Sequence, residues 1–397
     1  MTQVAIIGAG IGGLAAALAL HKHGIGVTVY EQAHQLEEAG AGIQLACNPN
    51  HVLRELGLLD ATAAAAFEPS ALDMMDGHSG RTLVSAELNG WARERYGAPY
   101  LSIHRGDLQR VLLDALQERI PGALQLNRRV VGLSQDDRSV TVTFADDKQA
   151  SADVAIGADG VHSVLREAVT TVEPARFTRH VAYRMLVPRS VIPRGKAPSE
   201  AISLRLGRHG HVVGYWVKGG DVYNMVAVTQ DDRWREENWR TPAELDEVRN
   251  AFRSWDGHLR MLIDSSRDVY KWALLDHSMP TSWARGRVAL LGDSCHAMLP
   301  FLAQGGAMAI EDAWVLAANL AATTDHTEAL RRYSDQRSSR VGRVHSTATK
   351  NADTFHLSGP ARTVRNVGLR LMGRTPHRFL TRMDWLYGVD VTAAPTV

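Results

Sequence analysis

The chain has 397 residues, of which 45% are hydrophobic, so it is long enough to bury a large core and to form more than one domain. Its 44 Lys and Arg residues balance 43 Asp and Glu residues, and the net charge of +1 gives no electrostatic reason to expect nucleic acid or an anionic membrane as a partner. Two cysteines are too few for a disulfide framework or a structural zinc site, and no apolar run is long enough to span a bilayer.

The first predicted elements form a βαβ unit. A fully apolar run, typical of a parallel strand covered on both faces, precedes Gly8, Gly10 and Gly13, and residues 14–20 are helix formers. In such a turn, the glycines permit a tight bend, a close approach of the backbone to a pyrophosphate and close helix–strand packing. Glu31 ends the next strand, where its carboxylate can accept hydrogen bonds from both hydroxyls of a ribose. The pattern predicts a dinucleotide site.

The middle of the first half alternates between helix and strand. Residues 105–116 have a helical period of apolar side chains, and residues 129–133 and 139–144 read as a hairpin. A buried strand over residues 152–157 then leads into a second glycine turn, Gly157-Ala158-Asp159-Gly160. The alternative is that this turn only connects a strand to a helix and has no functional role.

From about residue 180 the pattern becomes rich in strands and aromatic residues, which predicts a separate, inserted domain. The expected strands cover residues 181–187, 201–206, 211–217 and 222–229. An apolar strand over residues 288–291 then leads into a third glycine motif, Gly292-Asp293-Ser294-Cys295-His296, which is followed by a long helix. We expect Cys295 and His296 to belong to a packed turn and not to a metal site, because two adjacent residues cannot build a metal shell.

In this order and at this separation, the three motifs resemble the FAD-contacting segments of the single-component flavoprotein aromatic hydroxylases. The resemblance implies an α/β fold with a Rossmann-like FAD-binding domain of the para-hydroxybenzoate hydroxylase type. Its parts would be an FAD-binding domain over 1–179 and 276–349, an inserted β-rich substrate domain over 180–275 and a helical C-terminal segment over 350–397.

The resemblance also assigns cofactor contacts to an FAD that is bound noncovalently. Asp293 would bond the ribitol, and Gly305 and Gly306 would place a helix N-terminus near the flavin pyrimidine, where its dipole stabilises the negative charge of a reduced flavin. Asp159 would touch the cofactor. Arg105 would reach its phosphate or ribose, unless it is a surface arginine at a helix start.

Candidate substrate residues come from the inserted domain and from the first motif's neighbourhood. His211 and Tyr215 match a histidine–tyrosine pair that relatives place on a strand facing the ring, and residues i and i+4 of a strand share a face. With a pKa near 6.5, the histidine would take the ring-hydroxyl proton at neutral pH. The alternative is a structural strand histidine with a tyrosine packed beside it. Gln44 is a further substrate candidate, and Pro300 resembles the proline beside the reactive edge of the flavin.

The implied function is an FAD-dependent monooxygenase that uses NADH or NADPH and O2 to hydroxylate a small phenolic or hydroxypyridine carboxylic acid through a flavin C4a-hydroperoxide. Gln44 weakens a 6-hydroxynicotinate substrate and Pro300 weakens 3-hydroxybenzoate, because relatives with those activities tend to differ there. Decarboxylating hydroxylation of salicylate type stays open. The alternatives are a flavoprotein oxidase or a non-catalytic flavin-binding redox regulator.

The remaining expectations concern partners and location. Because the first strand begins by residue 4, we expect no signal peptide and a cytoplasmic protein. The expected partners are the aromatic acid, O2 and NAD(P)H, with no nucleic acid, no membrane and no metal. A homodimer stays open.

Overall fold

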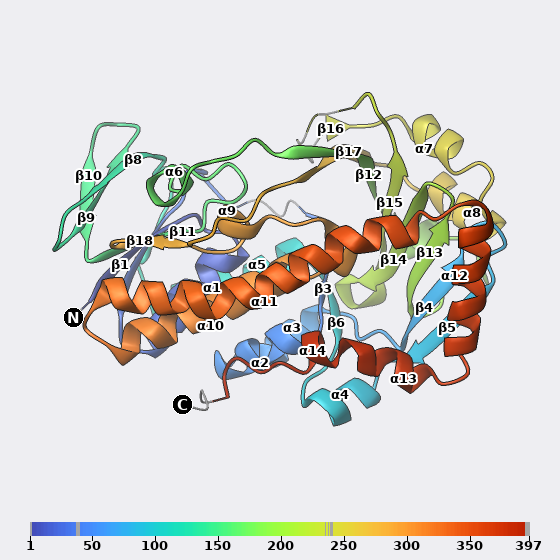
Figure 1. The fold of residues 1–397 in the computed structure, drawn as a ribbon, viewed down its shortest axis with the longest axis horizontal. Helices are drawn as coiled ribbons and strands as arrows, with labels where there is room; N and C mark the ends of the chain where they lie inside the picture. Colours follow the sequence, from blue (N-terminus) through green and yellow to red (C-terminus); the bar gives the residue numbers. More distant parts are fainter. Residues whose placement is uncertain (1, 37–39, 235, 237, 239–240, 394–397) are drawn as a thin grey trace.

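The computed structural model describes residues 2–36, 40–234, 236, 238 and 241–393. Two sheets lie side by side along the length of the molecule, and the long helix α11 (His326–Phe355) runs past both of them (Figure 1). The last four residues of the predicted helical tail, 394–397, lie outside the described residues.

The first sheet is the Rossmann-like sheet that the sequence predicts. It has the strand order β18-β19-β11-β1-β2-β7. The strands are β1 (Gln3–Ile7), β2 (Gly26–Tyr30), β7 (Leu124–Gln125), β11 (Val154–Gly157), β18 (Ala284–Arg285) and β19 (Val288–Leu290). Because β1, β11 and β19 are adjacent and parallel, their carboxyl ends lie at one edge of the sheet. Each of the three glycine motifs follows one of these strands, so the motifs meet at that edge.

Helix α1 (Ile11–Lys22) is buried on nearly all sides, which is why its sequence is apolar without a polar stripe. It packs against α5 (Arg105–Arg119) and α10 (Gly305–Ala322). A β-carbon at Gly12 would lie 2.6 Å from Cδ2 of Leu291 and 3.3 Å from Cβ of Ala309. The glycine therefore permits the close contact between α1, the third motif and α10.

The second sheet has the strand order β16-β17-β12-β15-β14-β13-β4-β5. Its strands are β4 (Ala71–Asp76), β5 (Thr82–Glu87), β12 (Arg176–Pro188), β13 (Ile202–Gly207), β14 (Gly210–Val217), β15 (Val222–Gln230), β16 (Thr241–Pro242) and β17 (Val269–Asp276). The sheet extends beyond residues 180–275, because β4 pairs in parallel with β13 and brings β5 with it. Local periodicity did not reveal these two strands, since their partner lies far along the chain. The division of the chain into domains stays a prediction.

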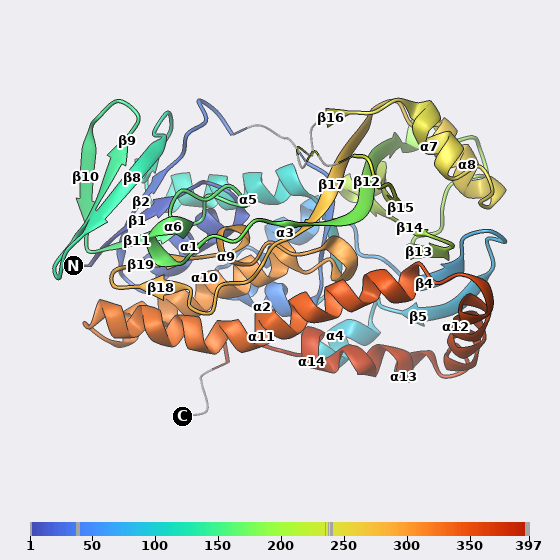
Figure 2. The ribbon, with the colours of Figure 1, turned by 45° about the horizontal axis from the view of Figure 1, so that its top comes forward.

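The two faces of the second sheet bury different cores. Helices α7 (Leu245–Ala251) and α8 (Gly257–Asp264) cover its outer face (Figure 2), where Val212 and Trp216 belong to a core of their own. Val213 and Tyr215 alternate with them on β14 and join the core that includes the first sheet. Odd-numbered residues of this strand, His211 included, therefore face the first sheet.

Smaller elements complete the described part of the chain. The hairpin predicted around residues 129–144 is confirmed as β8 (Val130–Gln135) and β9 (Val140–Phe144), with β10 (Gln149–Ala152) beside β9; β3 (Gly42–Leu45) pairs with β6 (Leu101–His104). The other helices are α2 (Cys47–Glu55), α3 (Leu59–Ala65), α4 (Trp91–Tyr96), α6 (Arg166–Val169), α9 (Asp293–His296), α12 (Gly359–Met372), α13 (Pro376–Leu380) and α14 (Asp384–Tyr387). None of the described helices is long and apolar enough to cross a membrane.

A buried cluster of charges connects α10, α11 and the third motif. Arg337 donates from Nη1 to Oε2 of Glu311 and from Nε to Oδ1 of Asp312, both at 2.6 Å. Asp312 also pairs with Nε2 of His296 at 2.6 Å, and Arg340 donates to Glu311 at 2.7 Å. Burial alone would raise the pKa of Asp312, but His296 and Arg337 outweigh it and leave that pKa below its ordinary value.

Arg337→Met should strongly destabilise the protein, because it removes the guanidinium that joins two buried carboxylates. Breaking a buried pair in this way costs about 3–5 kcal/mol. Arg331 lies on the exposed side of the same helix, where it bonds Glu328 and Asp335, so Arg331→Met should cost less than about 1 kcal/mol. Urea and thermal unfolding measure both changes, and similar losses for the two variants would contradict the assignment.

Candidate functional site

The three glycine motifs are in direct contact at the edge of the first sheet. A β-carbon at Gly8 would lie 2.4 Å from the carbonyl oxygen of Ala158, so the first and second turns touch through their backbones. Arg166 joins the second turn to the third. Its Nε donates to the carbonyl of Ser294 at 2.7 Å and its Nη2 to that of Asp293 at 2.9 Å. The edge is thus one continuous surface built from three distant parts of the chain.

The first turn has the geometry expected of a phosphate-binding loop. Gly8 has φ +106°, and a β-carbon at Gly13 would lie 2.0 Å from the Gly8 carbonyl oxygen, so both positions require glycine. At Gly10 a β-carbon would meet no atom within 4 Å. Glu31 accepts a hydrogen bond from the backbone N–H of Ala9 at 2.8 Å, which places its carboxylate beside the turn, at the end of β2.

Helix α5 adds a residue that the sequence analysis did not single out. Gln109 donates from Nε2 to the carbonyl of Ala9 at 2.8 Å and so holds the first turn. It lies four residues after Arg105, the half-buried first residue of the helix, and this spacing puts the two on one face. The spacing of four residues from Arg105 could therefore have identified Gln109 from the sequence.

Asp159 has one occupied and one unoccupied carboxylate oxygen. Its Oδ2 accepts from the backbone N–H of Val164 at 2.8 Å and so closes the second turn. Its Oδ1 is buried and has no hydrogen-bond partner among the described residues. Burial raises the pKa of this carboxyl, against the opposing effect of its hydrogen bonds.

The third motif places an exposed carboxylate next to the start of α10. Asp293 is exposed, and a β-carbon at Gly305 would lie 3.9 Å from its Oδ1. At Gly306, a β-carbon would meet only Cδ1 of Ile43, at 4.0 Å. The first turn of α10 therefore offers open backbone, and a helix N-terminus carries free N–H groups and a positive dipole end.

The side of the second sheet that faces the first sheet carries the candidate substrate residues. His211 and Tyr215 are both buried on β14 and flank the half-buried Val213. Leu204 and Val226 are cross-strand neighbours of Val213 on β13 and β15. The three aliphatic side chains form an apolar floor with a polar residue at either end.

Gln44 lies at the tyrosine end of this floor. It accepts a hydrogen bond from the hydroxyl of Tyr100 at 2.6 Å, and Tyr387 of α14 contacts Tyr100 edge to face with ring centroids 5.7 Å apart. Burial raises the pKa of Tyr215, which Gln44 partly offsets through a hydrogen bond. Gln44 and Tyr215 were each predicted as substrate residues from sequence, whereas Tyr100 and Tyr387 were not.

The histidine end is closed by a 3₁₀ helix, η3 (Pro300–Leu302). Pro300 is exposed, whereas Phe301 is buried with its ring centroid 5.0 Å from that of His211. The segment that precedes α10 thus touches the substrate face directly, so the predicted cofactor turn and His211 are neighbours.

The expectation that His211 titrates near pH 6.5 is wrong. Burial, with a smaller effect of two neighbouring histidines, lowers its pKa well below that value. The imidazole is consequently neutral at pH 7 and able to accept a proton.

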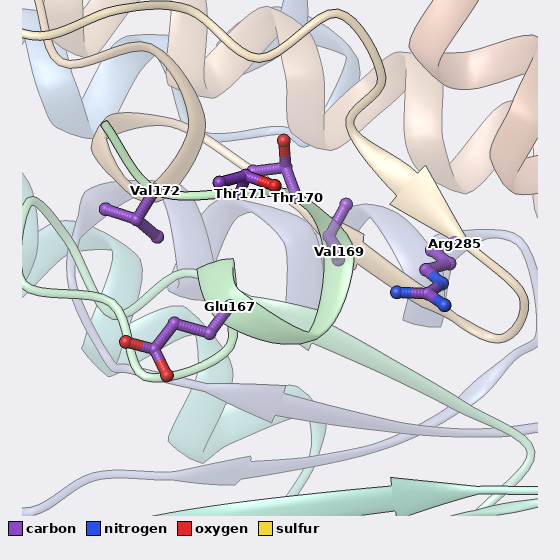
Figure 3. A pocket seen from close by; sticks show the side chains of 6 residues that line it. All are labelled: Glu167, Val169, Thr170, Thr171, Val172 and Arg285. Carbon is purple, nitrogen blue, oxygen red and sulfur yellow. The ribbon is translucent and has the colours of Figure 1, made fainter.

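An open hollow of about 600 Å³ lies between the end of α6 and β18 (Figure 3). Its lining consists of Glu167, Val169, Thr170, Thr171, Val172 and Arg285. None of these is a motif glycine or a candidate substrate residue, so we do not place the reaction there.

Comparison with known proteins identifies the family. Residues 1–348 match the family described as FAD binding domain. The 3-amino-4-hydroxybenzoate 2-monooxygenase PtnB3 of Streptomyces platensis is 38% identical over 99% of this chain and 97% of its own. The 6-hydroxynicotinate 3-monooxygenase of Bordetella bronchiseptica is 35% identical over 100% and 97%. The crystal structure of Klebsiella pneumoniae HpxO with FAD and uric acid has a TM-score of 0.84 and 30% identity over 97% of both chains.

The chain belongs to the FAD-dependent aromatic hydroxylases. The predicted family, fold class and monooxygenase activity are thereby confirmed, with FAD as cofactor and NAD(P)H as co-substrate.

The described residues of this hydroxylase fit FAD. Gly10, Gly305 and Gly306 leave open space where side chains would otherwise stand. The unpartnered buried oxygen of Asp159 is an acceptor that a ligand donor would satisfy, and Asp293 presents an exposed carboxylate.

Asp293→Ala should weaken FAD binding while leaving the fold intact, because the carboxylate is exposed and lies beside the open start of α10. A hydrogen bond to a charged group contributes about 1.5–3 kcal/mol, so the dissociation constant should rise by about ten- to a hundredfold. Flavin fluorescence titration of the apoprotein measures this. Asp335→Ala, at an exposed aspartate of α11, is the matched control, and equal affinities in the two variants would exclude the role.

Proposed function

We propose that this hydroxylase acts on the ring of a small phenolic or hydroxypyridine carboxylic acid, with O2 and either NADH or NADPH. The two relatives act, by name, on 3-amino-4-hydroxybenzoate and 6-hydroxynicotinate, which are aromatic acids with a ring hydroxyl. The observation that carries the proposal is the placement of His211 and Tyr215 at opposite ends of one apolar floor. Such a surface can bury a planar ring and still offer a proton acceptor to its hydroxyl.

In this proposal the cofactor lies along the edge of the first sheet. The first turn would take the pyrophosphate, as the open backbone at Gly10 supports. Glu31 would take the adenosine ribose, Asp293 the ribitol, and the start of α10 the pyrimidine of the flavin. The full set of cofactor residues is Gly8, Gly10, Gly13, Glu31, Arg105, Asp159, Asp293, Gly305 and Gly306.

The chain's own residues would bind, orient and deprotonate the substrate. Leu204, Val213 and Val226 exclude water from one face of the ring. Tyr215 and Gln44 orient it through hydrogen bonds, and His211 accepts the hydroxyl proton, which makes the ring electron-rich. Bound FAD, reduced by NAD(P)H, supplies the oxidising chemistry from O2. Pro300, exposed next to Phe301, would line the space between cofactor and ring.

A hydroxylase of this kind oxidises NAD(P)H faster when its substrate is bound. A flavoprotein oxidase or a flavin-binding regulator would not. NAD(P)H oxidation should therefore rise strongly when an accepted aromatic acid is added, with one hydroxylated product per NAD(P)H consumed. A panel that begins with 3-amino-4-hydroxybenzoate, 6-hydroxynicotinate, 3-hydroxybenzoate and salicylate tests this, with mass spectrometry of the products to detect loss of CO2. Unchanged oxidation with every acid, or formation of peroxide alone, would reject the proposal.

His211→Ala should lower the rate of hydroxylation by about 10²–10⁴-fold, the range contributed by a positioned proton acceptor. FAD affinity should change little, because His211 is not one of the predicted cofactor residues and reaches the cofactor turn only through Phe301. The wild-type rate should show no fall around pH 6.5, because burial lowers the pKa of His211 well below that value. The rate should fall only at lower pH, where the protonated imidazole can no longer accept a proton. Initial rates across pH measure this, and normal turnover in the variant would make His211 structural.

A further inference from the structure

Three histidines from distant parts of the chain form a continuous hydrogen-bonded row. Nδ1 of His211 lies 2.8 Å from Nε2 of His356, and Nδ1 of His356 lies 3.0 Å from Nε2 of His180. His211 belongs to β14, His180 to β12, and His356 is the residue that ends α11. The row uses Nδ1 of His211 and leaves its Nε2 for the substrate.

The row leads from two buried histidines to a half-buried one, whose Nδ1 is itself buried. His211 and His356 are 4% and 7% exposed, and the rings of Phe301 and Phe355 pack against His211 at centroid distances of 5.0 and 5.3 Å. His180 is only half-buried. Within the described part of the chain, no residue trio of the kind that holds a metal ion includes these histidines.

A positive charge is disfavoured at all three histidines, and least at the outer one. Burial lowers the pKa of His211 well below its ordinary value and that of His356 to about 3, with further lowering by His180, His209 and Arg365 at His356. Burial also lowers the pKa of His180, but there a hydrogen bond with the backbone of Thr178 and the charge of Asp353 act in the opposite direction. A proton accepted at His211 is therefore unstable in place and is more stable beside Asp353.

We propose that His211, His356 and His180 form a proton relay that carries the ring-hydroxyl proton of the substrate out of the site. The inference rests on the proposed role of His211. The substrate O–H bond breaks and its proton binds Nε2 of His211. The Nδ1 proton of His211 passes to Nε2 of His356, whose Nδ1 proton passes to Nε2 of His180. The substrate becomes an anion and His180 an imidazolium. Because Nδ1 of His180 is buried and its Nε2 faces His356, the ring must turn before it releases a proton to water; no electrons are transferred.

In this relay, His356 and His180 are positioning and transfer residues that do not touch the substrate. Glutamine can keep hydrogen bonds in their places but cannot gain and lose a proton. His356→Gln and His180→Gln should therefore slow proton removal without lowering the affinity for the aromatic acid. His345→Gln is the matched control, because His345 lies on α11 beside Asp276 and outside the row.

The test measures ionisation directly in the FAD-loaded enzyme. 4-Hydroxy-3-nitrobenzoate is the probe, because its phenolate is coloured, and a stopped-flow jump to higher pH follows its deprotonation in the site. The two relay variants should ionise the bound probe about a hundredfold more slowly than wild type, at the lower end of the contribution of a positioned proton acceptor. In His180→Ala, added imidazole should restore the rate, because the outer position is half-buried.

The outcomes separate the relay from the function on which it rests. Wild type that neither ionises the probe nor hydroxylates any phenolic acid would overturn the proposed function. Wild type that does both, with equal ionisation rates in His180→Gln, His356→Gln and His345→Gln, would overturn the relay alone. If His356→Gln does not fold, His180→Gln and the imidazole rescue of His180→Ala decide, since residue 180 is not enclosed by the core.

Discussion

The backbone contact between the first two glycine turns is the constraint on which the rest of the site depends. No side chain fits between Gly13 and the Gly8 carbonyl, or between Gly8 and Ala158, so the ends of β1 and β11 can approach only through glycine. Arg166 then fastens the third turn to the second through two backbone carbonyls. The third turn carries the Asp293 carboxylate, which lies beside the start of α10.

The second sheet faces this edge with a surface that combines apolar and polar groups. Strand alternation sends Val212 and Trp216 into one core and Val213 and Tyr215 towards the other. The same strand therefore supports the outer helices and presents the candidate substrate residues. Phe301 connects this surface to the predicted cofactor edge, because it packs against His211 immediately before the turn that begins α10.

Short-range constraints made much of this arrangement predictable from sequence. The glycine turns, Glu31 at a strand end and the i, i+4 pair on β14 each depend on residues close together in the chain. Gln109 could also have been predicted, because it follows Arg105 by one helical turn. The sequence did not reveal β4 and β5 as members of the second sheet, nor Tyr100 and Tyr387 beside Gln44. Those contacts depend on pairing between distant segments, which local periodicity does not encode.

Helix α11 fixes the distance between the buried charge cluster at Arg337 and His356 beside β14. Arg337 anchors it in the buried charge cluster behind the third motif, and about five turns further on, roughly 28 Å along the axis, the helix delivers His356 to β14. One inserted residue between these points would turn His356 by about 100° and move it about 1.5 Å. The segment can therefore vary in its exposed side chains but not in its length, so descendants of this chain should accumulate substitutions along α11 and exclude insertions and deletions there.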